Sequence, residues 1–540
     1  MNITVRVVAP ALLLATLVLL PFFGKPFTID DTVFLFEARH ALADPLHPTA
    51  FEMTWRYSPE RVSQLVPTGP IMAWLLVPSI LAGGSEWIAH AIQLVMFCLA
   101  ILATVSLGRR LGFATPWAAA SGLILVGMPA VLAMAGTAMP DVPAMALGVM
   151  GVERLVAWTQ DRRLLQAVSA ALLLGLAPLA RPHLLLILGV GAILIAGPVL
   201  LQQGWRNRLS VCLPLLGAPV ITAVMAFFTR DPDSGAGSLI GTAVYYSSLS
   251  GVRLAANFAA FLIHCVLVMA FALPWIAFRW RFMLRSHFTL TAAATGILGS
   301  ALALIIARQR PLVLAVVAGL GVAVLFDGIK DGLRRRDWMQ VALFCWVLIP
   351  LSAVPYVHLP PKYLIVSAPA MALLVTRQLA SRGGKTGWLI LAATVVVGMG
   401  LGVAILRADA VFADVGRRAA SELIAPRIAA GQRVWFVGRW GFQWYAEKAG
   451  ARPVTLTPPY PEPGDVIVAS AASARSDEIL DMIARRFARL IPVAHLEDTT
   501  PGGRIMNKRL GVGFYSNVSG YWPWMWGDSM IDAFSVWQIE

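Results

Sequence analysis

Two adjacent carboxylates, Asp30 and Asp31, follow the first strongly apolar segment of the chain, residues 7–23. Ionisable side chains at the edge of a membrane-length segment are costly to place there, so they are candidates for function. Such an acid can act as a general base, or it can cap the helix that follows, because Asp is a favoured N-cap residue. One Asp is enough for a cap, so the pair favours a chemical role for at least one member, and Asp30 is the expected reactive one.

Further polar side chains occur in the short turns between later apolar segments. They are Asp141, Arg181, His183, His358, Lys362 and Tyr363. Each has an ordinary structural explanation, because an acid can cap a helix, an arginine can extend to lipid phosphate, and Lys and Tyr can anchor a chain at the membrane surface. If these turns share one face of the membrane, the group could bind a phosphate and remove a proton from a hydroxyl.

This combination suits transfer of a group from a lipid phosphate to a hydroxyl. A carboxylate would take the proton of the acceptor, and the cations would stabilise the departing phosphate. Because the second pKa of a phosphate monoester is about 6, the phosphate can leave without a general acid. If the transferred group is a sugar, a single displacement inverts the anomeric carbon through an oxocarbenium-like state.

The composition predicts the elements that must position these residues. Hydrophobic residues make up 58% of the 540 residues and charged ones 13%, and the mean hydropathy is +0.72. These values indicate a polytopic α-helical membrane protein, with about 13 apolar segments of the length that crosses a bilayer. The expected spans are residues 7–23, 87–107, 116–135, 143–159, 164–180, 184–200, 209–229, 254–278, 287–307, 311–326, 338–354, 364–380 and 386–406. The segment 70–81 is too short to cross and is expected to be interfacial or re-entrant.

Charge in the connecting loops predicts the orientation. Basic clusters, such as residues 109–110, 279–285 and 330–336, are expected in the cytoplasm, and loops with acids or few charges outside. The amino terminus is then cytoplasmic and the carboxyl-terminal segment lies outside. Much of the net charge of +14 sits in the cytoplasmic loops, where it orients the spans, so it does not indicate nucleic-acid binding.

Two domains are predicted. Residues 1–406 form the transmembrane domain, with a long outer loop at 24–86, and residues 407–540, which are charged and of mixed periodicity, form a water-soluble α/β domain. The second domain is expected to contain helices at 414–429, 440–448 and 476–490, and strands at 433–438, 452–456 and 465–469.

The outer loop is expected to contain a helix, residues 32–43, that lies on the membrane surface. Its apolar face, which includes Phe34, would contact lipid or protein. Glu37, His40 and Asp44 would face water.

Several short motifs resemble the GT-C class of membrane glycosyltransferases. They are the run from Ile29 to Arg39, the isolated Asp141, the pair Arg181-Pro182 and the segment from Pro361 to Pro369. Within that class, the chain is most similar to bacterial members of the protein O-mannosyltransferase and aminoarabinose transferase superfamily, over residues 1–406. The resemblance implies catalysis on the periplasmic side of the bacterial inner (plasma) membrane, with a polyprenyl-phosphate sugar donor and a lipid, glycan or protein acceptor.

The resemblance also implies roles for individual residues. Asp30 corresponds to the first acid of the family's Asp-Glu pair and is the expected base, whereas Asp31 stands in place of the Glu. Asp141 matches an acid that orients donor or acceptor. The expected contacts of the donor phosphate are Arg181, Lys362, Tyr363, His183 and His358. No metal is expected to be obligatory, because the sequence has no compact Asp/His ligand cluster.

Two other classes of function stay open. A transporter or lipid flippase of cell-envelope intermediates would need broken or charged helices near the bilayer centre and two related halves, and the halves of this chain do not match. A non-catalytic assembly factor would recruit partners through its outer domain. Replacement of Asp30 separates these classes, because only an enzyme would lose a covalent product.

Overall fold

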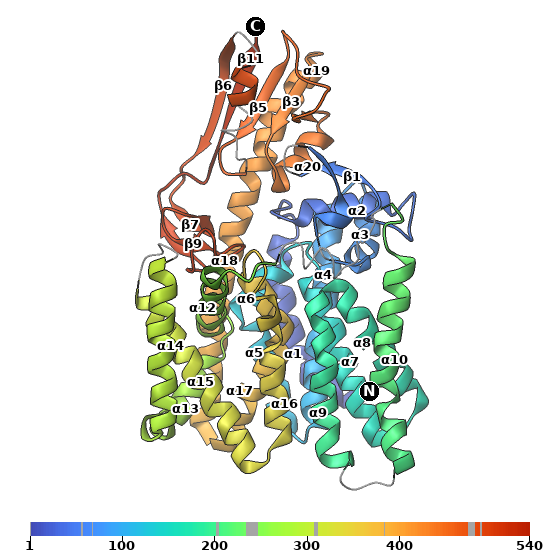
Figure 1. The fold of residues 1–540 in the computed structure, drawn as a ribbon, viewed down its shortest axis with the longest axis vertical. Helices are drawn as coiled ribbons and strands as arrows, with labels where there is room; N and C mark the ends of the chain where they lie inside the picture. The colour runs from blue at the N-terminus through green and yellow to red at the C-terminus, as the bar shows by residue number, and fades with distance from the viewer. Residues whose placement is uncertain are drawn as a thin grey trace.

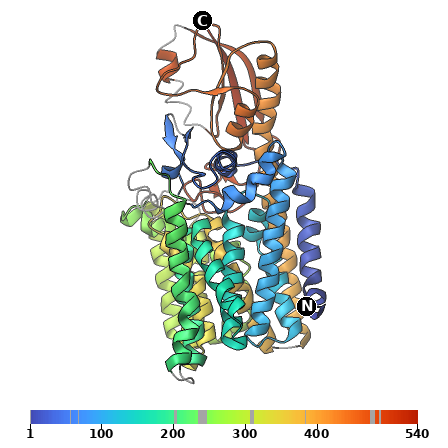
Figure 2. The ribbon, with the colours of Figure 1, turned by 90° about the vertical axis from the view of Figure 1, so that its right-hand side faces the viewer.

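The computed structural model describes residues 2–55, 58–66, 68–200, 205–233, 247–306, 312–382, 384–473, 481–485 and 489–540. A bundle of long helices forms the larger part of the molecule, and a unit with a β-sheet lies at one end of it (Figure 1). The view at right angles shows the same arrangement, with the bundle helices roughly parallel (Figure 2). The sheet and the end of the bundle nearest to it form the side on which the candidate residues lie.

Helices occupy most of the described chain before residue 430. The bundle helices are α1 (Asn2–Leu19), α3 (Ile71–Leu81), α4 (Glu86–Arg110), α5 (Thr115–Val126), α6 (Pro129–Ala135), α7 (Asp141–Asp161), α8 (Leu164–Ala180), α9 (Ile187–Leu200), α10 (Trp205–Phe228), α12 (Gly251–Leu267), α13 (Ala272–Arg285), α14 (His287–Ile306), α15 (Val313–Arg335), α16 (Trp338–Val347), α17 (Ala368–Arg382) and α18 (Gly384–Ala419). Short 3-10 helices, η3 (Pro182–Leu186), η4 (Ile349–Ala353) and η5 (Pro361–Ser367), lie between them.

The apolar helices confirm a multi-pass membrane protein. Among the described residues, seven helices are long and apolar enough to cross a membrane, and two bent helix pairs raise the number to nine. Four further predicted spans are shorter apolar helices of 10–17 residues. The helix α3, which is not a predicted span, falls in the same length class. The total of about 13 crossings therefore stays a prediction.

Two predicted spans are not single helices. The expected span 116–135 is divided into α5 and α6, which meet at 66°, and the span 254–278 into α12 and α13, which meet at 90°. The first break directly precedes Pro129, which has no backbone N–H to donate and disfavours a helical residue before it. At the second break Ala270 has a φ of 47°, outside the helical region.

The helix of the outer loop is covered by protein. It is α2 (Asp31–His40), and it packs between α3 and a helix of the C-terminal unit, α20 (Trp440–Lys448). The prediction that Glu37 faces water is wrong, because its side chain is 0% exposed. Neither of its carboxylate oxygens has a hydrogen-bond partner in the described part of the chain, and burial raises the pKa of Glu37 well above its ordinary value.

A five-stranded mixed sheet organises the C-terminal unit, in the order β4-β3-β5-β11-β6. The strands are β3 (Val434–Val437), β4 (Arg452–Pro453), β5 (Val466–Ser470), β6 (Leu490–Asp498) and β11 (Asp532–Ile539). β3 pairs in parallel with β4 and β5, and β11 pairs antiparallel with β5 and β6. Every residue of β3 and β5 is buried, as expected for central strands covered on both faces.

Short two-stranded ladders complete the described strands. One in the outer loop pairs β1 (Glu52–Thr54) with β2 (Pro59–Arg61). Two others near the C-terminus pair β7 (Gly502–Arg504) with β10 (Met525–Gly527) and β8 (Met506–Asn507) with β9 (Val512–Gly513).

One helix connects the bundle to the sheet without a break. α18 continues through a π-helical turn (Ala420–Ile424) into α19 (Ala425–Ala429), and Figure 1 shows it leaving the bundle toward the sheet. Residues 414–429 are helical, as predicted, but they continue the helix that leaves the bundle, and the predicted boundary after residue 406 falls inside α18. The physical reason is that no proline interrupts the chain between residues 384 and 425. Most of the predicted helix 476–490 lies outside the described residues.

Candidate active site

Five of the predicted residues come together from four separate turns. The Nζ of Lys362 donates a hydrogen bond to Oδ2 of Asp30 at 2.6 Å. The guanidinium of Arg181 donates two bonds to the carboxylate of Asp141, at 2.9 and 2.7 Å. Both cations lie against the ring of Tyr363, at 5.3 Å for Arg181 and 5.9 Å for Lys362. Acids and cations that are far apart in the sequence thus form one cluster.

Asp30 is the accessible acid of this cluster. It occupies the N-cap position of α2, but its side chain makes no capping bond, so the capping explanation is wrong for Asp30. Its side chain is 31% exposed, whereas that of Lys362 is 3% exposed. Burial acts to raise the pKa of Asp30, but the charge and hydrogen bond of Lys362, together with the charge of Arg181, outweigh burial and hold the pKa below its ordinary value. Asp30 is therefore ionised at neutral pH and can accept a proton.

The backbone directly before Asp30 is strained. Ile29 has a φ of 40°, a left-handed conformation that is rare for a β-branched residue and costs on the order of 1–3 kcal/mol. Hydrogen bonds to the preceding residues hold the chain in place. The N–H of Phe27 donates to Tyr445 at 2.9 Å, and the hydroxyl of Thr28 donates to Asp409 at 3.1 Å. This arrangement directs Asp30 toward Lys362.

Asp31 has a different environment from Asp30. It is 0% exposed, and its two oxygens accept backbone N–H bonds from Thr28 at 2.9 Å and from Ala138 at 2.8 Å. These bonds join the loop that carries Asp30 to the turn that precedes Asp141. The geometry therefore gives Asp31 a positioning role in place of the predicted catalytic one, because no face of its carboxylate is open to a substrate.

Asp31 is expected to make the protein less stable as the pH rises. Burial raises the pKa of Asp31 to about 7, so the folded protein keeps a proton that the unfolded chain loses near its ordinary pKa of about 4. The stability from this proton is fully present below about pH 4 and is lost as the pH rises through about 7. The thermal unfolding temperature in detergent should fall more steeply between pH 4 and pH 7 for the wild type than for Asp31→Asn. Parallel curves would contradict the assignment.

Asp141 and Arg181 form a buried pair. Asp141 is 0% exposed and Arg181 is 7% exposed. The hydrogen bonds of the Asp141 carboxylate among the described residues come from Arg181 and not from a backbone N–H of α7, so Asp141 does not cap that helix. Burial of Arg181 also excludes its extension to the phosphates of the bilayer surface. Both oxygens of Asp141 face the guanidinium, so its role is to orient Arg181, whose remaining N–H groups can bind an anion.

Aromatic and imidazole rings surround Tyr363. The ring centroids of His183, His358 and Tyr356 lie 6.0, 6.3 and 6.1 Å from that of Tyr363. Tyr363 is 8% exposed, so the explanation as a membrane-surface anchor is wrong. The Nε2 of His183 is buried and has no partner in the described part of the chain, which leaves it available to a ligand group.

His358 is neutral at physiological pH. Burial lowers its pKa to about 4, and the charge of Lys362 acts in the same direction. Its Nδ1 lies 3.0 Å from the hydroxyl of Ser516 in the C-terminal unit. His358 can therefore hydrogen-bond a phosphate, as predicted, but it does not contribute a positive charge.

Lys362→Gln is expected to weaken binding of a polyprenyl phosphate far more than His358→Gln. A charge-assisted hydrogen bond contributes about 1.5–3 kcal/mol and a neutral one about 0.5–1.5 kcal/mol. The expected losses are therefore roughly 10- to 150-fold for Lys362 and below about 15-fold for His358. Direct binding measurements near pH 7 on the purified variants check this order, and equal losses would contradict it.

Two buried groups that stand out less in the sequence hold the first loop in place. The Nζ of Lys25 donates to Oδ2 of Asp409 in α18 at 2.8 Å, and the hydroxyl of Tyr515 donates to the same oxygen at 2.9 Å. Lys25 is 3% exposed and Asp409 is 1% exposed. An acid inside an apolar helix is costly unless it has a partner, so it is a candidate for a buried ion pair or for function. The sequence alone could therefore have identified Asp409 as such a candidate.

An asparagine pair holds the loop that carries His358. The amide of Asn257 donates to the carbonyls of Val354 and Tyr356, at 2.9 and 2.8 Å. Asn517 donates to Asn257 at 3.0 Å and accepts the N–H of Leu359 at 2.9 Å. The C-terminal unit thus contributes directly to the walls of the candidate site, and no local sequence pattern predicts these contacts.

Comparison with solved structures identifies the class of fold. The chain superimposes on ArnT from Cupriavidus metallidurans, solved bound to undecaprenyl phosphate, with a TM-score of 0.50, 18% identity and coverage of 91% of this chain and 96% of ArnT. It also superimposes on the Archaeoglobus fulgidus oligosaccharyltransferase, solved with Zn and sulfate, with a TM-score of 0.50 and 14% identity. That match covers 83% of this chain and 62% of the archaeal protein.

The chain therefore has the fold of GT-C glycosyltransferases, which confirms the resemblance noted in its motifs. No protein-family model matches the sequence, and no curated protein matches it. At these levels of identity the likeness extends to the fold, and the chemistry must be argued from the site.

Proposed function

We propose that this protein is an inverting glycosyltransferase that moves a sugar from a polyprenyl-phosphate donor to a hydroxyl of a lipid, glycan or protein acceptor. The observation that carries the proposal is the pairing of an accessible, ionised acid, Asp30, with Lys362 at 2.6 Å, next to Arg181. The fold supports it, since a solved structure with this fold binds undecaprenyl phosphate.

In the proposed reaction the acceptor oxygen attacks the anomeric carbon of the donor. Its proton passes to the carboxylate of Asp30. The bond between the anomeric carbon and the phosphate oxygen breaks, and its electron pair stays on the phosphate, which Lys362 and Arg181 stabilise. Inversion follows because attack and departure occur on opposite faces of the sugar.

The bond between Lys362 and Asp30 couples donor binding to catalysis. A donor phosphate would share the ammonium of Lys362 with Asp30, and it would thereby weaken the hold of Lys362 on the carboxylate. Because a cation beside a carboxylate lowers its proton affinity, this exchange makes Asp30 a better base when the donor is bound.

The proposal includes the orientation and the domains. We place the cluster and the C-terminal α/β domain, residues 407–540, in the periplasm of a bacterial inner membrane, with about 13 crossings in residues 1–406 and a cytoplasmic amino terminus. The support is that basic residues concentrate at the opposite end of the bundle, as in the ends of α13 and α15.

We also propose that no metal is obligatory. The positive charge that a departing phosphate requires is already supplied by Arg181 and Lys362. Asp30 and Asp141, the two acids of the cluster, are each paired with one of these cations. Transfer in the presence of a chelator should therefore match transfer without it.

Reconstitution with labelled donors tests the proposed function. Purified protein in lipid vesicles is incubated with a panel of polyprenyl-phosphate sugars and with lipid, glycan and peptide acceptors. The expected result is transfer of label from one donor, with release of polyprenyl phosphate. Movement of the intact donor across the vesicle membrane, without a covalent product, would favour a flippase instead. If the donor neither reacts nor crosses the membrane, the result would favour an assembly factor.

A further inference from the structure

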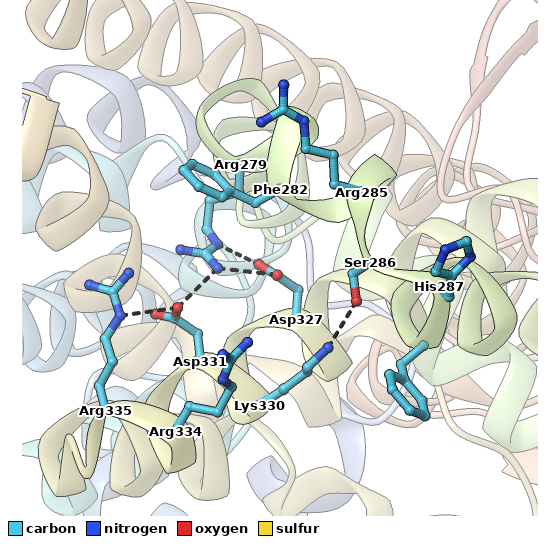
Figure 3. Close-up of a pocket in the computed structure, with 11 residues that line it drawn as sticks. Arg279, Phe282, Arg285, Ser286, His287, Asp327, Lys330, Asp331, Arg334 and Arg335 are labelled. Atoms are coloured by element: carbon cyan, nitrogen blue, oxygen red, sulfur yellow. Dashed lines mark hydrogen bonds and ion pairs between the residues drawn. The ribbon is translucent and has the colours of Figure 1, made fainter.

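A polar cavity lies at the end of the bundle far from the candidate active site. It has a volume of about 620 Å³ and is formed by the adjoining ends of α13, α14 and α15. Figure 3 shows its charged side chains, which come from the second half of α13, from the start of α14 and from the last turns of α15. The cavity has no part in the proposed transfer reaction.

The cavity has an excess of positive charge. Its basic residues are Arg279, Arg285, Lys330, Arg334 and Arg335, and its acids are Asp327 and Asp331. The acids already have partners, because Arg279 bonds to both and Arg335 lies 3.1 Å from Asp331 (Figure 3). Arg285 and Arg334 have no ion-pair partner among the described residues, so their charge can neutralise a bound anion.

Exposed aromatic rings border these charges. Phe282 and Phe288, which line the cavity, are 57% and 70% exposed. The Nζ of Lys330 lies 5.1 Å from the ring centre of Phe288 and donates to Ser286 at 2.9 Å. A water-soluble anion would leave these rings exposed, whereas a lipid can place its phosphate on the cations and its acyl chains on the rings.

The position of the cavity agrees with a lipid ligand. α14 and α15 are both long and apolar enough to cross a membrane, and the basic residues follow directly at the end of α15. Basic pockets between transmembrane helices at the cytoplasmic surface bind the headgroups of anionic lipids. A second cavity of about 290 Å³ shares Arg279 and Arg335 and adds the ion pair of Arg377 with Asp337, so the polar lining continues toward α17.

We propose that this cavity binds the phosphate headgroup of an anionic phospholipid from the leaflet opposite the candidate active site. Arg285, Arg334 and Lys330 supply positive charge for the phosphate, and Phe282 and Phe288 contact the acyl chains. Neutral phospholipids bind less well, because they cannot compensate the unpaired charge.

Native mass spectrometry of the full chain in detergent tests this proposal. The probes are phosphatidylglycerol, phosphatidylcholine and inorganic phosphate. The wild type should retain phosphatidylglycerol in preference to phosphatidylcholine. Each basic residue at an anionic lipid surface contributes about fivefold, so Arg285→Gln/Arg334→Gln should weaken phosphatidylglycerol binding roughly 30-fold.

The matched control is Arg281→Gln/Arg336→Gln, which removes the same charge from the same end of the bundle outside the cavity. This control should bind as the wild type does. Thermal unfolding identifies any variant that fails to fold, and Phe288→Ala, which keeps every charge, should also weaken lipid binding. Equal losses in both double variants, equal retention of the two lipids, or displacement of phosphatidylglycerol by millimolar inorganic phosphate would overturn the proposal.

Discussion

Replacement of Asp30 by Asn is expected to abolish sugar transfer and to leave the protein folded and able to bind its donor. Asn has nearly the same shape but cannot accept the proton of the acceptor, and loss of a general base costs about 10²- to 10⁴-fold in rate. Lys362 keeps its charge in the variant, so donor binding should be equal to that of the wild type or tighter. Transfer rates and binding of a polyprenyl phosphate, measured on the same preparation, check both expectations.

Asp44→Asn is the matched control for this prediction. Asp44 belongs to the same outer loop, is partly exposed and bonds to His47, away from the cluster. The Asp44→Asn variant loses the same charge as Asp30→Asn, but at a position away from the cluster. It should therefore transfer sugar at the rate of the wild type. Substantial activity in Asp30→Asn, with the product confirmed, would show that Asp30 is not the base.

Separation of Asp141 from Arg181 is expected to produce the largest loss of stability. Asp141→Asn leaves a buried guanidinium without its bidentate partner, and removal of one member of a buried ion pair costs about 3–5 kcal/mol. Arg181→Met should be similarly costly, because it leaves the carboxylate of Asp141 buried alone. The measurement is thermal or denaturant unfolding in detergent.

The double variant Asp141→Leu/Arg181→Met separates stability from binding. Apolar replacement of a whole buried pair is often neutral for stability, so the double variant should unfold near the wild type. It should nevertheless bind polyprenyl phosphate at least about tenfold more weakly, since a charge-assisted contact is lost. Recovery of both stability and binding would mean that Arg181 serves the fold alone.

The convergence of the cluster could be predicted from the sequence because it depends on orientation. Alternation of basic and acidic loops places Asp30, Asp141, Arg181 and Lys362 at the same ends of their helices, and the short turns leave them little freedom. The pairing could not be predicted. Asp30 and Lys362 are 332 residues apart, and several topologies would bring the same charges to one face with different partners.

The different environments of two neighbouring acids could not be predicted from sequence patterns. Asp30 and Asp31 have the same side chain and adjacent positions, yet one is 31% exposed and the other 0%. The carboxylate of Asp31 is buried where it accepts hydrogen bonds from the backbone N–H groups of Thr28 and Ala138. No periodic pattern in the sequence predicts those contacts. The sequence pattern predicts wrongly that Glu37 faces water for a related reason. The helix that covers Glu37, α20, comes some 400 residues later in the chain.

From its amino acids alone, this chain could be recognised as a many-helix membrane protein with acids and cations gathered at one surface, because apolar length and loop charge are local properties that follow directly from side-chain type. Which acid stays open to a ligand, which cation it pairs with, and how the C-terminal unit encloses the site depended on tertiary structure. Burial and hydrogen-bond partners are set by packing between segments hundreds of residues apart, and those contacts exist only once the helices and the sheet have assembled.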